Sequence, residues 1–333
     1  ELISVVLAGG QGLRLWPEST EEHPKQLCDF LGRGSLLAMT LQRLRPLGLL
    51  LVVAGESQRD ILEQEVAAWR AVLLTEPLGR NTAPAVGLVL AGMENAGDEV
   101  LGIFPADHHI ENDMEFRRVL EVAAGLARQG YLVTVGIVPV YAETGYGYIE
   151  RDGEIELDSG AYVVKAFHEK PDASTARGYL HNGNFYWNAG IFLATIKTWR
   201  GLMQEFMPGI YSYILQGQDA YREAYPTFPN ISIDYAIAEK CRQMAVVEGS
   251  FGWSDIGSWD ALAAVLEQDG DGNAMSGTAV AIECRGCLGR SREKKLVLFG
   301  LEDMVAVETD DNILVCPRSR SQDIKSLLDT LKG

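Results

Sequence analysis

The chain has 333 residues, which is enough for about two domains and a large buried core. A hydrophobic content of 47% and a charged content of 23% are typical of a folded globular protein and exclude a disordered one. The net charge of −17 argues against general binding to nucleic acid or to an anionic membrane. A local cluster of cations or a metal ion must therefore hold any anionic substrate.

No apolar run of about 18 residues occurs, so we expect no transmembrane helix. Glu1 leads directly into the strand-like Leu2–Leu7, without the basic and then apolar segments of a signal peptide. Five cysteines, an odd number in a long chain, indicate a reducing compartment. We therefore expect a cytoplasmic protein. Cys284 and Cys287 form a CxxC motif, but no second pair completes a zinc site, which favours two small strand residues.

Strand and helix signals alternate from the N-terminus as far as Ile137. This alternation predicts a largely parallel sheet that is covered by helices on both faces. Ligands of such sheets lie beyond the carboxyl ends of the strands, so the residues that follow each strand are the candidates for a site. Strands are predicted over 4–7, 49–53, 71–74, 100–104 and 131–137, and helices after Ser35 and over 57–69, 83–94 and 114–128.

The rest of the chain changes character at a turn-rich break, Asp269–Asn273. The expected domains are a mixed α/β domain over 1–268 and a small β-rich domain over 277–333. Before the break, strands are predicted over 163–167, 185–193 and 244–247, and helices over 195–206, 233–242 and 259–266. After it, short strands are predicted over 278–283, 295–299, 304–308 and 312–316, and a helix over 322–331.

A glycine-rich segment after the first strand is the strongest chemical signal. Leu7–Pro17 reads LAGGQGLRLWP, and such a loop lets backbone N–H groups approach phosphates closely. It is no Walker A loop, and Leu15 stands where a dinucleotide fingerprint has its third glycine. Arg14 and Lys25 add two cations that suit a phosphoryl group. Either one alone would be read as a solvated surface residue, but together with the loop they favour a phosphate site.

Two carboxylates follow predicted strands and are candidates to ligate Mg²⁺. Asp107 comes after the strand 100–104, and it lies too far upstream to cap the next helix. Asp255 belongs to the segment Trp253–Gly257. Its alternative role is the N-cap of the helix over 259–266.

Three other segments place polar groups or glycines where a ligand could bind. Glu169 and Lys170 form a charged pair after the strand 163–167. Asn188 lies inside an apolar strand and needs hydrogen-bond partners there, either a sugar hydroxyl or a structural contact. Thr144–Tyr148 is a glycine-spaced loop that is either an ordinary turn or a close approach of the backbone to a ligand.

This set of motifs resembles the sugar nucleotidyltransferases and, within them, the mannose-1-phosphate guanylyltransferases. The Trp-Pro pair at 16–17 and the Pro-Lys-Gln at 24–26 point to the guanylyl branch of the family. The motifs occur in order over most of the chain: Leu7–Pro17, Pro24–Gln26, Glu76–Pro84, Pro105–His108, Gly145–Ile149, Glu169–Pro171, Asn188–Gly190, Ser232–Tyr235 and Trp253–Gly257.

The resemblance implies an α/β fold: a Rossmann-like nucleotidyltransferase domain with a mixed sheet. A small C-terminal β-rich domain, a short left-handed β-helix, would follow it. The implied reaction converts GTP and α-D-mannose 1-phosphate to GDP-mannose and pyrophosphate, with Mg²⁺ as cofactor. An oxygen of the sugar phosphate would attack the α-phosphorus in line, a transfer that depends on positioning and charge neutralisation.

The resemblance also assigns roles to residues. Arg14 and Lys25 would grip the triphosphate, Lys170 would bind the sugar phosphate, and Asp107 and Asp255 would hold Mg²⁺. Arg14, Lys25, Asp107 and Lys170 form the expected catalytic set. Gly147, Glu169 and Asn188 would bind mannose hydroxyls, and the nucleotide would also meet Leu7, Ala8, Gly9, Gly10, Gly12, Glu76, Asn81, Thr82 and Ala83.

Alternatives remain open at this point. The chain could take another hexose 1-phosphate or another nucleoside triphosphate, because epimers differ by the position of one hydroxyl. It could also be a non-catalytic regulatory paralogue that only binds nucleotide sugars, although the full set of phosphate and metal residues argues against this. The expected partners are the two substrates, and a homodimer is one assembly open to the chain.

Overall fold

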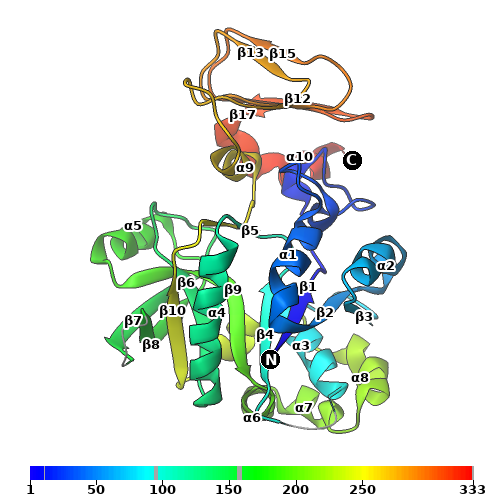
Figure 1. Ribbon diagram of the computed structural model, residues 1–333, viewed down its shortest axis with the longest axis vertical. Coiled ribbons are helices and arrows are strands. Elements are labelled where there is room, and N and C mark those ends of the chain that lie inside the picture. Colours follow the sequence, from blue (N-terminus) through cyan, green and yellow to red (C-terminus); the bar gives the residue numbers. More distant parts are fainter. Residues whose placement is uncertain (11, 94–96, 156–159, 332–333) are drawn as a thin grey trace. The chain divides into compact units, whose positions relative to one another are not determined.

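The computed structural model describes residues 1–10, 12–93, 97–155 and 160–331 (Figure 1). The chain forms two compact units. Unit 1 consists of residues 1–9, 40–106 and 110–253. Unit 2 consists of residues 10–39, 107–109 and 254–333. The glycine-rich segment therefore starts in unit 1 and continues in unit 2.

Unit 1 is built on a sheet with the strand order β3-β2-β1-β4-β9-β6-β10-β8-β7 over the described residues. Strand β1 pairs in parallel with β2 and β4, and its Val5 and Val6 are completely buried. Burial on both faces explains why this strand reads as one continuous apolar run. The strands are β1 (Leu2–Leu7), β2 (Gly48–Gly55), β3 (Val72–Glu76), β4 (Val100–Pro105), β6 (Leu132–Ile137), β7 (Tyr148–Glu154), β8 (Ala161–His168), β9 (Phe185–Thr195) and β10 (Met244–Gly249).

The parallel arrangement predicted for the strands before Ile137 is confirmed for β1 to β4, which pair in parallel, while later strands reverse the direction. Strand β9 runs antiparallel to β4, β6 and β7, and β8 runs antiparallel to β7 and β10. The sheet is therefore mixed, as the family resemblance implied. An apolar run such as Phe185–Leu193 predicts a buried strand, but its pattern carries no information about direction.

Helices cover the sheet of unit 1, and α4 does so through an amphipathic face. Helix α4 packs on β6, β9 and β10 with Phe116, Val119, Leu120 and Ala123, which recur at helical spacing. Asn112 caps it, because its side-chain oxygen accepts the N–H of the third helical residue. The helices are α1 (Leu36–Leu44), α2 (Arg59–Ala68), α3 (Thr82–Ala91), α4 (Asp113–Arg128), α5 (Ala173–Asn182), α6 (Ile196–Phe206), α7 (Pro208–Ile214) and α8 (Gln218–Ala224).

The helix predicted over 233–242 is wrong in length and type. The chain forms a single π-helical stretch over Asp234–Ala238. The N–H of Glu239 donates to the carbonyl of Asp234, five residues earlier, which widens the turn. The chain leaves the helical conformation after Cys241 and enters β10 at Met244.

Unit 2 holds short strands that stack in parallel, which is the arrangement of a β-helix. Its larger sheet has the order β12-β14-β16-β17, with only β17 antiparallel to its neighbour over the described residues. A second sheet pairs β13 with β15 in parallel. The elements are β12 (Ala274–Gly277), β13 (Val280–Ile282), β14 (Leu288–Ser291), β15 (Val297–Phe299), β16 (Met304–Glu308), β17 (Ile313–Pro317), α9 (Trp259–Val265) and α10 (Ile324–Leu331).

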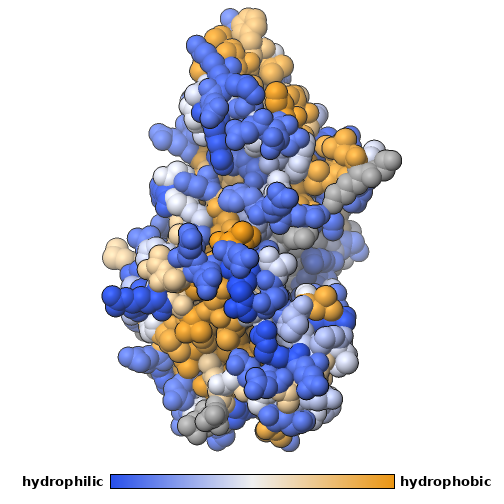
Figure 2. All heavy atoms as spheres, turned by 90° about the vertical axis from the view of Figure 1, so that its right-hand side faces the viewer, coloured by the Kyte–Doolittle hydropathy of each residue, from blue (hydrophilic) through white to orange (hydrophobic). Residues whose placement is uncertain are grey.

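Along the short strands β13 and β15, successive side chains point alternately to the surface and to the interior of unit 2. Leu298 points inward and packs with Cys284 and Cys287, which are free thiols. Burial raises the pKa of the Cys287 thiol. Four large apolar side chains of β13 and β15 share the opposite face, and hydrophobic residues show on this part of unit 2 at the top of Figure 2. They are Val280, Ile282, Val297 and Phe299.

The core of unit 2 contains residues from both of its long segments, 10–39 and 254–333. Leu15, Phe30, Trp259, Leu288 and Val305 belong to one buried cluster. The rings of Phe30 and Trp259 meet edge to face with centroids 6.1 Å apart. The segment after the glycine-rich loop is therefore packed on the β-helix.

Two short strands are β5 (His109–Ile110) and β11 (Trp253–Ser254). Short 3-10 turns lie at Leu13–Leu15, Lys25–Leu27, Arg45–Leu47, Glu56–Gln58, Tyr225–Thr227 and Arg318–Asp323. Among the described residues, none of the helices has the length and apolar character needed to cross a membrane.

Candidate functional site

In unit 1 the residues that follow β1 approach Glu76 at the end of β3, past the intervening strand β2. A methyl group added to Gly9 would stand 3.1 Å from Oε1 of Glu76. Glu76 is buried and accepts a hydrogen bond from the hydroxyl of Tyr225, which is itself buried. Burial raises the pKa of the Glu76 carboxyl, although the bond from Tyr225 opposes the shift. Leu7, Ala8, Gly9 and Glu76, four of the expected nucleotide contacts, thus meet at one edge of the sheet.

The other expected nucleotide contacts in unit 1 form the start of α3. Asn81 has a φ of 67° and caps the helix by accepting the N–H of Thr82 at 2.9 Å. The hydroxyl of Thr82 accepts the N–H of Ile233 at 2.8 Å, and the N–H of Ala83 donates to Ile231. These residues anchor the turn, while Asn81 itself stays exposed. Its exposed side chain is the part of this turn that a ligand can reach.

In unit 2 the glycine loop is shaped around Lys25. Gly12 has a φ of 63°, and a methyl group at this position would lie 2.3 Å from Cβ of Lys25. Only glycine fits both the left-handed backbone and this contact. The carbonyl of Gly12 accepts the hydroxyl of Ser19 at 2.7 Å. Arg14 follows in the 3-10 turn Leu13–Leu15 and is exposed, as is Gly10.

The ammonium of Lys25 connects the two aspartates that the sequence singled out. Its Nζ lies 2.7 Å from Oδ2 of Asp107 and donates to the carbonyl of Asp255 at 2.5 Å. Burial by itself would raise the pKa of the Asp107 carboxyl, but Lys25 and His108 outweigh it and hold the pKa below its ordinary value. Asp107 is therefore ionised at neutral pH.

Neither aspartate is used as a helix cap. Asn112 caps α4, and Ser258 caps α9 by accepting the N–H of Ala261 at 3.2 Å. The side chain of Asp255 instead accepts the N–H of Gly257 at 3.0 Å. The N-cap alternative for Asp255 is thus wrong.

The donor set of Asp107 and Asp255 fits Mg²⁺. Mg²⁺ binds through one or two carboxylates and fills its other positions with water and substrate phosphate oxygens. Asp107 is an ionised carboxylate whose side chain is 31% exposed, so it remains accessible. Over the described ranges, no group of three or more His, Cys, Asp and Glu side chains could hold a metal ion. Phosphate and water oxygens would therefore have to complete the coordination.

Unit 1 also brings together the residues expected to bind the sugar phosphate. A methyl group at Gly147 would lie 2.6 Å from Oε2 of Glu169, and the carbonyl of Gly147 accepts the N–H of Asn188 at 2.8 Å. Lys170 has a φ of 46°, and its ammonium lies 3.2 Å from Oε1 of Glu169. Glu169 is largely buried while Lys170 is exposed, so Lys170 can reach an incoming anion.

Asn188 finds structural partners within the protein. Its Nδ2 donates to Oδ1 of Asp234 at 2.8 Å, and its Oδ1 accepts from Thr134 and from the N–H of Gly190. Burial and the nearby Glu169 raise the pKa of Asp234 to about 6. Sequence reasoning did not single out Asp234 as a site residue, although its motif Ser232–Tyr235 was noted.

Aromatic rings stand next to the sugar-phosphate residues. The ring of Tyr146, the chain neighbour of Gly147, lies 5.3 Å from both Trp187 and Trp253 between centroids. Trp187 also contacts Tyr141 at 4.8 Å. Sequence reasoning missed this cluster, because its members come from separate segments of unit 1.

Comparison with known proteins adds to this geometry. A family model described as "Nucleotidyl transferase" matches residues 3–272, and one described as "MannoseP isomerase/GMP-like beta-helix domain" matches residues 277–331. XanB, a xanthan biosynthesis protein of Xanthomonas campestris pv. campestris, is 38% identical over 349 residues, covering 100% of this chain and 74% of its own. Mannose-1-phosphate guanylyltransferase of Escherichia coli is 38% identical, covering 99% of this chain and 74% of its own.

A solved structure resembles the chain over its whole length. It is described as a mannose-1-phosphate geranyltransferase from Thermus thermophilus, with a TM-score of 0.93 and 33% identity. The match covers 100% of this chain and 99% of that one. The mixed sheet, the stacked strands of unit 2 and these full-length similarities show that the chain belongs to the mannose-1-phosphate guanylyltransferase family of nucleotidyltransferases.

Proposed function

We propose that this sugar-phosphate nucleotidyltransferase transfers GMP from GTP to α-D-mannose 1-phosphate. The observation that carries the proposal is the contact of Lys25 with the carboxylate of Asp107 and with the backbone carbonyl of Asp255, beside Gly12. A cation next to a glycine loop and two aspartates is what transfer of a nucleotidyl group needs. Relatives named mannose-1-phosphate guanylyltransferase support the choice of substrates.

In the proposed reaction a phosphate oxygen of mannose 1-phosphate forms a bond to the α-phosphorus of GTP. The bond between the α-phosphorus and the bridging oxygen of pyrophosphate breaks, and pyrophosphate leaves with that electron pair. Such a transfer is accelerated by holding the reactants in line and by stabilising charge. Bound Mg²⁺ would neutralise triphosphate charge, and Asp107 and Asp255 would hold it.

The other residues of the proposed site bind and orient the substrates. Lys25 and Arg14 donate to triphosphate oxygens, and Lys170 donates to the sugar phosphate. Glu169, Asn188 and the backbone at Gly147 hold sugar hydroxyls. The nucleotide meets Leu7–Gly10, Gly12, Glu76 and Asn81–Ala83, which lie at strand ends, in the glycine loop and at the start of α3.

The test is release of pyrophosphate by the purified full chain with GTP and Mg²⁺, with mannose 1-phosphate present or omitted. We expect release only when the sugar phosphate and the metal are both present. Glucose 1-phosphate and the other nucleoside triphosphates serve as matched controls. Equal rates with glucose 1-phosphate would refute mannose specificity. Binding of GDP-mannose without any release would favour the regulatory paralogue.

Three statements stay predictions from the sequence. They are the division into domains over 1–268 and 277–333, the cytoplasmic location and the homodimer.

A further inference from the structure

A buried arginine in the β-helix contacts the segment that carries Lys25. Arg290 lies in β14, and its side chain is 10% exposed. A guanidinium that leaves water must recover its hydrogen bonds within the protein, or its burial is costly. The partners of Arg290 therefore show which part of the fold it serves.

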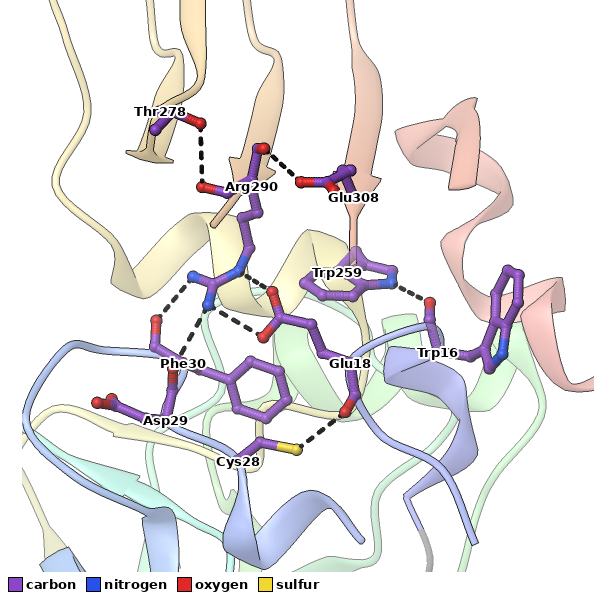
Figure 3. Close-up of polar contacts among 10 residues, drawn as sticks. Trp16, Glu18, Cys28, Asp29, Phe30, Trp259, Thr278, Arg290 and Glu308 are labelled. Atoms are coloured by element: carbon purple, nitrogen blue, oxygen red, sulfur yellow. Dashed lines mark hydrogen bonds and ion pairs between the residues drawn. The ribbon is translucent and has the colours of Figure 1, made fainter. Parts of the chain in front are cut away.

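The guanidinium of Arg290 forms its hydrogen bonds with one stretch of chain, Glu18–Phe30 (Figure 3). Nε and Nη2 form a two-pronged pair with the carboxylate of Glu18, at 2.6 and 3.1 Å. Nη1 donates to the carbonyl of Phe30 at 2.9 Å, and Nη2 also donates to the carbonyl of Asp29 at 3.4 Å. The guanidinium further lies 5.7 Å from the centroid of the Phe30 ring.

These contacts hold the chain on both sides of Lys25. Glu18 precedes Lys25, while Asp29 and Phe30 follow it. The carbonyl of Glu18 also accepts the thiol of Cys28 at 3.4 Å, and the N–H of Cys28 donates to the carbonyl of Lys25 at 3.0 Å. Arg290 is thus connected to Lys25 through Glu18 and Cys28, and it also holds the backbone that follows Cys28.

Strand β14 is itself held in place on the β-helix. Next to Arg290, the hydroxyl of Ser291 donates to Oε2 of Glu308 at 2.5 Å, and its carbonyl accepts the N–H of Thr278 at 3.0 Å. Leu288 and Gly289 pair in register with β12 and β16. The guanidinium therefore projects toward the Glu18–Phe30 stretch from a strand that is paired on both sides.

We propose that Arg290 is a positioning residue for the nucleotide triphosphate, acting through Glu18 and the Glu18–Phe30 backbone on Lys25. The β-helix thereby keeps the Lys25 ammonium against Asp107 and the carbonyl of Asp255. This proposal rests on the proposed function, because it assumes that Lys25 binds the triphosphate. Only arginine has the planar fork that can serve one carboxylate and two carbonyls together, so lysine cannot replace it.

The experiment compares two full-length single variants, Arg290→Lys and Glu18→Gln, and the double variant that carries both substitutions, with the wild type. Arg320→Lys is the matched control, because Arg320 lies in unit 2 and pairs with Asp323 in an exposed position. The readouts are pyrophosphate release with each substrate varied in turn, hydrogen exchange of the amides of residues 18–30, and the melting temperature.

We expect both variants to remain folded while kcat/KM for GTP falls about 10- to 100-fold, the usual loss when a supporting partner is removed. KM for mannose 1-phosphate should stay within about twofold, and the amides of residues 18–30 should exchange faster. The double variant should lose no more than the worse single variant, because the two side chains act as one pair. Arg320→Lys should match the wild type in every readout.

The proposal would be overturned if both variants had the wild-type kcat/KM for GTP and the wild-type rate of hydrogen exchange at residues 18–30. A parallel loss toward both substrates would overturn it as well, because it would indicate a general structural role. If Arg290→Lys does not fold, Glu18→Gln supplies the same comparison. A wild-type chain that releases no pyrophosphate would refute the proposed function, whereas unchanged exchange in the variants would refute the role of Arg290 alone.

Discussion

The ammonium of Lys25 lies 2.7 Å from the carboxylate of Asp107, although 82 residues separate them in the chain. The lysine side chain is 7% exposed, and this carboxylate and the carbonyl of Asp255 provide the hydrogen bonds that a buried ammonium needs. Gly12 leaves the space in which its aliphatic part packs. Lys25 and Asp107 are thus in direct contact, and we expect that replacing each of them changes a different kinetic parameter.

Replacing Asp107 with asparagine should remove most of the Mg²⁺-supported rate while the fold survives. The amide has the size of the carboxylate but lacks the charge that a hard divalent cation requires. Pyrophosphate release across a range of Mg²⁺ concentrations, together with circular dichroism, measures both effects. Asp260→Asn is the control, because that carboxylate is exposed and pairs with Arg318. Near-normal turnover of Asp107→Asn would mean that Asp107 is no metal ligand.

Replacing Lys25 with alanine should cost roughly 2–4 kcal/mol of transition-state stabilisation, as for the loss of one donor to a developing charge. The loss should lie in kcat and in kcat/KM for GTP. Lys165→Ala is the control, since Lys165 is exposed and pairs with Glu150. A rise in KM with unchanged kcat would instead show that Lys25 binds ground state and transition state equally.

A methyl group at Gly147 should weaken sugar-phosphate binding with little loss of stability. The new Cβ would stand 2.6 Å from the end of the Glu169 side chain, which can move but would leave its position. Loss of a charged hydrogen bond predicts a rise in KM for mannose 1-phosphate of about tenfold or more. Gly153→Ala is the control, because nothing lies within 4 Å of a methyl group there. An equal rise in KM for GTP would contradict this assignment.

Replacing Asp234 with asparagine should stabilise the protein above about pH 6 and leave its stability unchanged at pH 4. Burial and Glu169 raise the pKa of Asp234 from 3.8 to about 6, so the folded state retains a proton that the unfolded state releases. The stability from this group is present below about pH 4 and is lost as the pH rises through about 6. The asparagine can still accept from Asn188, so we expect a gain of about 1–2 kcal/mol at pH 8.

Urea unfolding of Asp234→Asn and of the wild type at pH 4 and pH 8 measures this difference. The two proteins should be alike at pH 4. A difference of the same size at both values would show that the asparagine acts through packing and not through the charge of Asp234.

The local pattern of hydrophobic residues was sufficient to predict a strand or helix that is buried on all sides or along one face. The apolar runs of β1 and β4 and the helical spacing of α4 are direct consequences of their surroundings. Pattern was insufficient where polar residues make up a strand. β14 reads Leu-Gly-Arg-Ser and was not predicted, because its pairing with β12 and β16 comes from stacking of the coils.

Some residues of the candidate site could likewise be predicted from the sequence, and others could not. The glycine loop, Lys25, Asp107 and Glu169 stand out in the sequence, because their residue types follow strands in a pattern that the chemistry requires. Asp234 does not, since an aspartate in a mixed segment has many ordinary uses. Its role becomes visible only through the bond from Asn188 and the nearby Glu169.

The sequence by itself determined which residue types are available at the strand ends and which family the chain resembles. Both depend on short stretches of neighbouring residues. Only the tertiary structure decided the direction of β9, the junction of Lys25 with Asp107, and the attachment of Arg290 to Glu18, which lies 272 residues away. Contacts between residues far apart in the chain depend on how whole elements pack, and no local pattern of hydrophobicity or charge records that packing.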